Sequence, residues 1–427
     1  MSRDAIRSDS LKRRILFVHH AADLGGASLS LLSLIERLDR RRYSPAVLFN
    51  CHPGSVAAPF QERGIPIDID PGISTYPHAQ GAWLGLRSLR PWEMLTRAFQ
   101  VRPSARRFRE FLRTHPCDLV HLNSSVQIPA AIGARDAGLP VVWHIREELH
   151  PGYTGLRRTW VRRCIERYAS HVIVISEQNA AQLPPGPRTT VVYNFVDFQR
   201  FDRSVSGREF RESLDLPANA PLVGMLGGVL DSKGGDVLTE AALLVRRRRP
   251  EVVFLIAGVP PGGESPSAVK RTLRRLVERL GIVPSAERRA LELIGRHGLE
   301  RTIRFLGLRR DIPEMLAACE LLVWPASVSH FSRPIIEAGA MARPVVASDF
   351  PSSRELVIDG TTGLLTPPGD PHRLAEAIVR LLERPDEARR MGDAGHALAR
   401  ERYDPERNAE AIFAIYDSIL APVGGRA

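Results

Sequence analysis

The sequence has no uninterrupted apolar run of about 18 residues, the length a helix needs to cross a bilayer. The apolar run 15–18 near the start is also too short for the core of a signal peptide, so we expect it to form a first strand. Cysteine is scarce, and no Cys-x-x-Cys pair occurs among Cys51, Cys117, Cys164 and Cys319. This spacing argues against a disulfide framework or a zinc knuckle and fits a reducing cytoplasm.

Acidic residues are clearly outnumbered only in the first half of the chain. Residues 1–200 hold 27 Lys and Arg against 17 Asp and Glu, whereas residues 201–427 hold 32 against 31. The excess gathers in two Arg-rich segments, 87–113 with Trp92 and Phe99, and 157–167 with Trp160. Basic residues beside aromatics suit an anionic membrane surface or an acidic lipid-linked acceptor. Solvated helix faces are the alternative, and no zinc-finger, homeodomain or RNA-binding aromatic pattern favours nucleic acid.

A chain of 427 residues exceeds one ordinary hydrophobic core, so we expect two domains of about 200 residues each. Short apolar runs alternate with helical patterns along the whole chain. This alternation predicts an α/β fold with parallel sheets of the Rossmann type. The predicted strands are 15–18, 46–50, 65–69, 118–123, 141–144 and 171–176 in the first half, and 221–228, 252–258, 303–307, 321–324 and 344–347 in the second.

Ligands of such sheets bind outside the carboxyl ends of the strands. Several predicted strands have polar residues at that end, namely His121, Asn123, His144 and Ser176. Gly25 and Gly26 follow the first strand, where glycine lets a ligand approach the backbone and the next helix N-terminus. We interpret the other histidines of this region as strand-end or surface residues: His19, His20, His52 and His78.

The second half contains a pattern typical of a nucleotide site. The loop 327–332 follows a predicted strand and leads into a helix whose first turn holds Pro334. Free N–H groups in the loop and the helix N-terminus suit a diphosphate, while Glu337 can accept two hydrogen bonds from a vicinal diol such as ribose. Lys233, after the strand 221–228, can meet a diphosphate as a point charge. An ordinary strand–helix unit with a surface Glu is the alternative interpretation.

The segment 331–348, FSRPIIEAGAMARPVVAS, resembles the signature of the group 1 (family four) retaining GT-B glycosyltransferases. That signature pairs two Glu residues eight positions apart. Glu337 matches the second, and Ser329 stands at the position of the first. The loop after strand 221–228 is similar to the family's phosphate-binding loop and retains its Lys as Lys233, but the Arg expected five residues earlier is Gly228.

The resemblance extends over residues 15–420 and implies two Rossmann-like domains facing each other across a cleft. It places an acceptor-side domain at 1–197, a nucleotide-sugar domain at 198–401, and a helix at 402–427 that crosses back to the first domain. The hinge is expected near the linker segment 193–197. The donor-binding residues that it implies are Gly25, Gly26, Gly228, Lys233, Leu308, Ser329, Phe331, Ser332 and Glu337. The catalytic residues are His144, Lys233 and Glu337, and the acceptor or sugar side is formed by His121, Asn123 and His144.

The implied activity is that of a hexosyltransferase, which moves a sugar from a UDP- or GDP-sugar to an acceptor hydroxyl with retention. Glycan or lipid-linked acceptors of polysaccharide, glycolipid or cell-envelope synthesis fit the family. We expect neither a cofactor nor a metal, because Lys233 and backbone N–H groups can stabilise the diphosphate. We expect a cytoplasmic protein, with the basic first domain against the inner face of the membrane. The alternatives are a catalytically silent binding or regulatory partner of an active transferase and, less favoured, a sugar-nucleotide epimerase.

The departures from the signature leave three explanations open for Ser329: a different donor sugar, substitution of the missing carboxylate by His330 or Glu355, or a chain that no longer turns over. An Arg from 301–310 is a candidate to replace the cation missing at Gly228. Asp68-Ile69-Asp70 has the form of an Asp-x-Asp metal motif, but its place at a strand end before a Pro-Gly pair argues against metal binding. The stretch 259–300 is longer than one helix and is interpreted as an insertion.

Overall fold

The computed structural model describes residues 12–22, 25–76, 91–149, 155–186, 188–214, 216, 219–259 and 286–421, without the side chains of 91–94. His78, the Arg87 end of the first basic segment and most of the predicted insertion 259–300 lie outside these residues. The chain divides into two compact units, Met1–Asn194 with Pro405–Ala427, and Phe195–Asp404.

The first unit contains a parallel sheet with the order β3-β2-β1-β4-β5-β6-β7. Its strands are β1 (Arg13–His19), β2 (Tyr43–Phe49), β3 (Ile67–Ile69), β4 (Leu119–Leu122), β5 (Val141–Ile145), β6 (His171–Val174) and β7 (Thr189–Val191). The order reverses between β1 and β4, so the carboxyl ends of these two strands flank the switch point where ligands bind in such sheets. The predicted parallel sheet is confirmed, although β7 was not among the predicted strands because three half-buried residues carry too little pattern.

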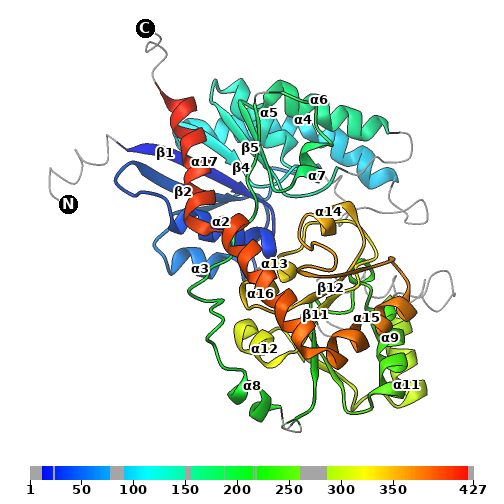
Figure 1. Cartoon of the computed structure of the whole chain (residues 1–427). Coiled ribbons are helices and arrows are strands. Elements are labelled where there is room, and N and C mark those ends of the chain that lie inside the picture. The colour runs from blue at the N-terminus through cyan, green and yellow to red at the C-terminus, as the bar shows by residue number, and fades with distance from the viewer. Residues whose placement is uncertain are drawn as a thin grey trace. The chain divides into compact units, whose positions relative to one another are not determined.

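The helices of the first unit are α2 (Gly26–Glu36), α3 (Ala57–Gln61), α4 (Pro91–Thr114), α5 (Ile128–Asp136), α6 (Leu156–Tyr168), α7 (Glu177–Ala180) and α17 (Pro405–Leu420). In Figure 1, α4, α5 and α6 lie side by side, and their apolar residues share one core with the sheet. Helix α17 belongs to this unit: its Tyr416 is fully buried, and its Asp417 accepts hydrogen bonds from Arg42 and Tyr43 at β2.

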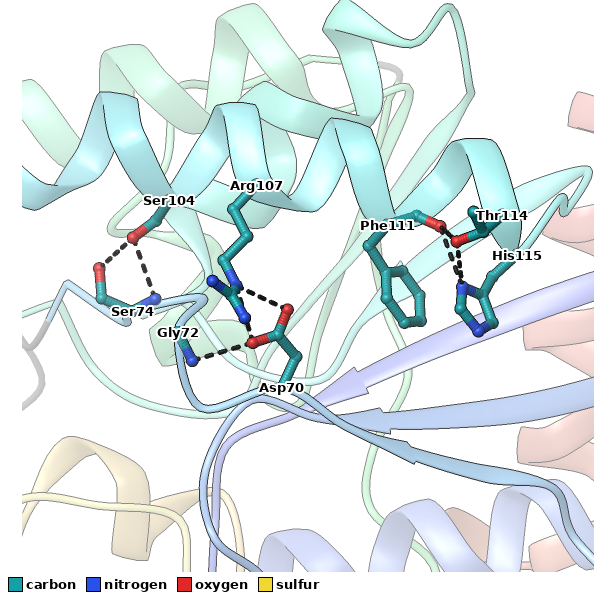
Figure 2. Close-up of polar contacts among 8 residues, drawn as sticks. All are labelled: Asp70, Gly72, Ser74, Ser104, Arg107, Phe111, Thr114 and His115. Carbon is teal, nitrogen blue, oxygen red and sulfur yellow. Dashed lines mark hydrogen bonds and ion pairs between the residues drawn. The ribbon is translucent and has the colours of Figure 1, made fainter.

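Polar contacts attach α4 to the segment after β3, as Figure 2 shows. The Arg107 Nε lies 2.8 and 2.9 Å from the two carboxylate oxygens of Asp70, and the N–H of Gly72 donates to the same carboxylate at 3.0 Å. Ser74 and Ser104 bond each other at 2.8 Å through their hydroxyls. The second acid of the Asp68–Asp70 pair is therefore bound by an arginine and a turn N–H.

The second unit contains a parallel sheet with the order β10-β9-β8-β11-β12-β13. Its strands are β8 (Leu222–Leu226), β9 (Val253–Ala257), β10 (Ile303–Gly307), β11 (Leu321–Trp324), β12 (Val345–Ser348) and β13 (Gly363–Thr366). The helices are α8 (Arg208–Ser213), the short 3₁₀ helix η2 (Asp231–Lys233), α9 (Gly235–Arg248), α11 (Ala286–His297), α12 (Ile312–Ala318), α13 (Arg333–Ala340), α14 (Pro351–Arg354), α15 (Pro371–Glu383) and α16 (Pro385–Arg402). The predicted second parallel sheet is confirmed.

The strands of this sheet are mostly buried because helices cover both faces, which explains their continuous apolar runs. The order reverses between β8 and β11, so the loops after these two strands meet at the switch point of the second sheet. Among the helices of the described residues, none has the length and apolar character needed to span a membrane.

Candidate functional site

Three glycines with positive φ shape the loop after β8: Gly227 at 104°, Gly228 at 72° and Gly234 at 70°. A Cβ on Gly228 would lie 2.6 Å from the carbonyl oxygen of Val259, and the N–H of Gly228 bonds to Ala257 at 3.1 Å. A side chain at position 228 would therefore meet both backbone strain and a backbone clash. The loop as it stands therefore requires glycine at position 228.

Lys233 ends η2, and its side chain is half-buried in the second unit. Its Nζ lies 2.8 Å from Nε2 of His330 and 4.6 Å from the centre of the Trp324 ring. Burial lowers the pKa of Lys233 to about 8. Burial and the neighbouring Lys233 charge lower the pKa of His330 to about 4, so its ring is neutral at pH 7. The lysine predicted from the sequence and a histidine of the loop 327–332 thus form one contact.

Helix α13 begins at the carboxyl-end loop of β11, with Ser332 as its N-cap residue and Pro334 in its first turn. The Ser332 side chain is buried, and its hydroxyl has no hydrogen-bond partner in the described part of the chain. An N-cap serine normally accepts a bond from the helix N-terminus, but the Ser332 side chain does not cap α13 in this way. Such a terminus carries partial positive charge and favours an anion.

Glu337 lies one turn into α13, as predicted, and only 9% of the residue is exposed. Its Oε1 lies 3.2 Å from Nη2 and 3.3 Å from Nε of Arg333, which precedes it by one turn. The sequence interpretation did not include Arg333. A carboxylate paired with a guanidinium keeps lone pairs that can accept further hydrogen bonds from a ligand.

The remaining donor-side residues have different surroundings. The Ser329 hydroxyl lies 2.9 Å from that of Ser352, which ties the loop 327–332 to α14. Leu308, after β10, is 80% exposed, and Phe331 is half-buried. Arg309, from the segment considered as a source of a second cation, is paired with Asp311 and has little freedom to replace the missing arginine.

In the first unit, the predicted sugar-side residues lie together at the carboxyl ends of β4 and β5. His121 and His144 are buried, and their rings are 5.4 Å apart in an edge-to-face arrangement. Burial, with a smaller effect of the Arg146 charge, lowers the pKa of both rings well below the ordinary value. Nδ1 of His121 bonds to the Tyr416 hydroxyl at 2.7 Å. Within the described residues, Nε2 of each ring lacks a partner.

Asn123, also predicted, connects this pair to His19 at the end of β1. Its amide nitrogen lies 3.0 Å from Nδ1 of His19, and Nε2 of His19 lies 2.9 Å from the Ser28 hydroxyl. His19 is a strand-end residue, as predicted, but it is fully buried rather than on the surface, and burial lowers its pKa to about 3. The sequence showed only that His19 ends the first strand, whereas its burial follows from the sheet order, which places β1 beside β4.

Gly25 is the N-cap of α2 and has extended backbone with φ −99°. A Cβ there would meet no atom within 4 Å among the described residues. Gly26 begins α2, and Ser176 caps α7 by accepting the N–H of Asn179 at 3.0 Å. The described residues contain no group of three or more His, Cys, Asp or Glu side chains that could hold a metal ion.

Comparisons with known proteins agree with this two-unit architecture. A family described as Glycosyltransferase Family 4 matches residues 24–200, and one described as Glycosyl transferases group 1 matches residues 206–397. The chain is 28% identical over 269 residues to an alpha-D-kanosaminyltransferase of Streptomyces kanamyceticus, covering 61% of this chain and 63% of the relative. It is 26% identical over 327 residues to the lipopolysaccharide core biosynthesis mannosyltransferase LpsB of Rhizobium meliloti, covering 74% of this chain and 85% of the relative.

The chain spans less than two thirds of some relatives, including 57% of a D-inositol 3-phosphate glycosyltransferase of Corynebacterium urealyticum, to which it is 27% identical over 59% of its own length. Among solved structures, HepE of Anabaena in complex with UDP and glucose superposes with a TM-score of 0.73 at 24% identity, covering 95% of this chain and 99% of HepE. This similarity confirms the predicted GT-B fold. The two family matches follow one another along the chain in the same order as the two Rossmann-like units.

Proposed function

We propose that this chain transfers a hexose-like unit from a UDP- or GDP-sugar to an acceptor hydroxyl, with retention of the anomeric configuration. The observation that carries the proposal is the half-buried ammonium of Lys233, held by His330 in the same unit as the N-terminus of α13 and the carboxylate of Glu337. The relatives named for kanosaminyl and mannosyl transfer, and HepE with UDP and glucose, support a nucleotide-sugar donor.

In this proposal the second unit binds the donor. Lys233 and the backbone N–H groups of Phe331 and Ser332 stabilise the negative charge that grows on the leaving diphosphate. Glu337 accepts hydrogen bonds from the ribose diol, and the backbone of Leu308 meets the base. Ser329 offers the sugar a hydroxyl in place of a carboxylate.

The first unit acts on the sugar and the acceptor through His121, Asn123 and His144, with the backbone of Gly25 and Gly26 close to the donor. Acceptors of polysaccharide, glycolipid or cell-envelope synthesis fit its basic helices. On α6, Leu156, Trp160, Arg163 and Arg167 recur at helical spacing, and all four are exposed. A stripe that is apolar at one end and basic along the rest suits peripheral contact with an anionic membrane.

The test uses the full-length protein and a panel of UDP- and GDP-sugars. One donor should raise the melting temperature, since a ligand at 100 times its Kd stabilises a protein by about 2.7 kcal/mol. The same donor should be hydrolysed slowly to free sugar and nucleoside diphosphate, and Lys233→Met should lose both effects. The anomeric configuration of a transferred sugar, read by NMR, tests retention.

The same assay distinguishes a silent binding partner and an epimerase from a transferase. Both alternatives are tested because Ser329 and Gly228 differ from the expected motif. Stabilisation by a donor without any release of sugar, even with acceptors present, would indicate a silent binding partner. Conversion of the donor to an epimer without free sugar would indicate an epimerase. A panel in which no donor changes the melting temperature would refute the proposed donor site.

A further inference from the structure

Arg146 follows β5 by one residue, and its half-buried guanidinium contacts three side-chain acceptors of the first unit. Its Nε lies 2.8 Å from Oδ1 of Asn123, and its Nη1 lies 2.6 Å from Oδ1 of Asn194. Its Nη2 lies 3.3 Å from Nδ1 of His144. The planar guanidinium of Arg146 therefore contacts two of the predicted sugar-side residues, Asn123 and His144, and also Asn194 of the linker segment 193–197.

A guanidinium has donors only, which decides the proton position on His144. Because Arg146 donates to Nδ1, that nitrogen must be the acceptor and carries no proton. A neutral imidazole then holds its proton on Nε2. That nitrogen is buried and has no partner in the described part of the chain. A buried donor without an acceptor is unfavourable, so Nε2–H is suited to an oxygen supplied by a ligand.

The same argument passes through Asn123 to His19. Since Oδ1 of Asn123 accepts from Arg146, the amide NH₂ faces Nδ1 of His19 at 3.0 Å and donates to it. His19 therefore also carries its proton on Nε2 and donates to Ser28 at 2.9 Å. Arg146 thus sets the direction of the hydrogen bond from Asn123 to His19, and that bond sets the direction of the bond from His19 to Ser28. One arrangement of protons therefore satisfies all these hydrogen bonds.

We propose that Arg146 is a positioning residue that fixes His144 as a neutral hydrogen-bond donor, with Nε2–H directed to an oxygen of the bound ligand. The ligand oxygen is a hydroxyl of the transferred sugar or of the acceptor, and this identification rests on the proposed function. His144 then orients the substrate and does not act as a general base, because its Nδ1 is occupied by the guanidinium. Asn194 holds the guanidinium in place through Nη1.

The direct test is the tautomer of His144, read by long-range ¹H–¹⁵N correlation on ¹⁵N-histidine-labelled protein at pH 7. His144→Gln assigns the signal by its loss. The wild type should show a neutral ring with the proton on Nε2. In Arg146→Met, which cannot donate, the form with a proton on Nδ1 should become populated. Arg41→Met, at an exposed position before β2, serves as the matched control and should leave the signal unchanged.

A wild-type His144 that is protonated on Nδ1 or doubly protonated would overturn the inference, and so would an unchanged tautomer in Arg146→Met. If that variant does not fold, Asn194→Ala should produce a smaller change in the same direction, and the wild-type spectrum decides in either case.

With the donor identified, Arg146→Met should lower kcat about tenfold with a smaller change in donor KM, and Arg146→Lys should restore only part of the lost kcat. Absence of turnover in the wild type would count against the proposed function and leave the tautomer result standing.

Discussion

The ammonium of Lys233 lies 2.8 Å from Nε2 of His330, whose other ring nitrogen lies 2.9 Å from the carbonyl oxygen of Val328. The carbonyl can only accept, so the ring donates from Nδ1 and accepts from Lys233 at Nε2. The Trp324 face completes these contacts at 4.6 Å. Because these partners are neutral, they orient the ammonium without compensating its burial, and the pKa of Lys233 falls to about 8.

Donor affinity should therefore depend on pH near neutrality. A diphosphate requires the charged ammonium, and about nine tenths of it is lost between pH 7 and pH 9 when the pKa is about 8. We expect the affinity for a nucleoside diphosphate sugar to fall about tenfold over this interval, measured by isothermal titration calorimetry.

The free energy of unfolding should change in the opposite direction. Between about pH 8 and pH 10.5 the unfolded chain binds more protons at Lys233 than the folded chain, so the second unit gains stability as the pH rises through that window.

Two variants separate Lys233 from other titrating groups. Lys233→Arg keeps its charge over the whole range and should show a nearly constant affinity between pH 7 and pH 9. Lys233→Met should bind weakly at both pH values. An unchanged slope in Lys233→Arg would assign the pH dependence to another group.

Glu337 should contribute to donor binding through the ribose hydroxyls. Hydrogen bonds to a charged group contribute about 1.5 to 3 kcal/mol, so Glu337→Ala should weaken UDP or GDP binding by a factor on the order of ten to a hundred. Wild-type protein should also prefer UDP to 2′-deoxyuridine diphosphate, and Glu337→Ala should lose most of that preference. Glu376→Ala, on the exposed face of α15, is the matched control.

A preference for the ribonucleotide that survives in Glu337→Ala would show that another group holds the diol. Arg333 must be considered in the same experiment, because removing Glu337 takes this carboxylate away from its half-buried guanidinium. Glu337→Gln keeps the shape and one acceptor, so it should lie between the wild type and the alanine variant. Melting temperatures of the three proteins exclude a folding defect as the cause.

An arginine at position 228, where the sequence resemblance expects one, should not provide a phosphate contact. Gly228 has φ 72°, and a Cβ would lie 2.6 Å from the Val259 carbonyl. The left-handed backbone alone costs roughly 1 to 2 kcal/mol for a residue with a side chain. We expect Gly228→Arg to lower the melting temperature by about 2 to 8 °C, measured by thermal unfolding.

Gly25→Ala is the matched control for folding, since its φ is −99° and no described atom lies within 4 Å of the added Cβ. It should keep the wild-type melting temperature. A Gly228→Arg protein with wild-type stability and tighter donor binding would contradict the backbone argument.

The periodic pattern of the sequence was sufficient for both parallel sheets. Buried strands such as β5 and β8 are continuous apolar runs, so their existence and approximate bounds were predictable. β13 was missed, as β7 was, because Gly363–Thr366 is short and begins with a glycine. The terminal helix predicted at 402–427 is α17, which begins at Pro405 and ends at Leu420, since Arg402 still belongs to α16.

The candidate site was predictable where a residue is fixed by its place on a strand or a helix. His121 and His144 lie in β4 and β5 near their carboxyl ends, Lys233 lies in the loop after β8, and Glu337 lies one turn into α13. The contacts of His330 with Lys233 and of Arg146 with Asn194 join positions 97 and 48 residues apart. Such pairs depend on loop conformation and rotamers, which periodicity does not encode.

The exposed stripe of α6 should bind anionic membranes. Leu156 is 72% exposed and Trp160 38%, and the exposed arginines Arg163 and Arg167 follow at helical spacing. Each basic residue near an anionic surface contributes about 1 kcal/mol, so reversing both charges should reduce binding by at least about tenfold. The measurement is co-sedimentation with phosphatidylserine-containing liposomes at low salt, and high salt should release the protein because it screens the charges.

The control is the double variant Arg247→Glu, Arg248→Glu, which makes the same change of charge at exposed positions of α9 and should bind like the wild type. Equal losses in both double variants, or no binding of the wild type at low salt, would leave the arginines of α6 as ordinary solvated residues.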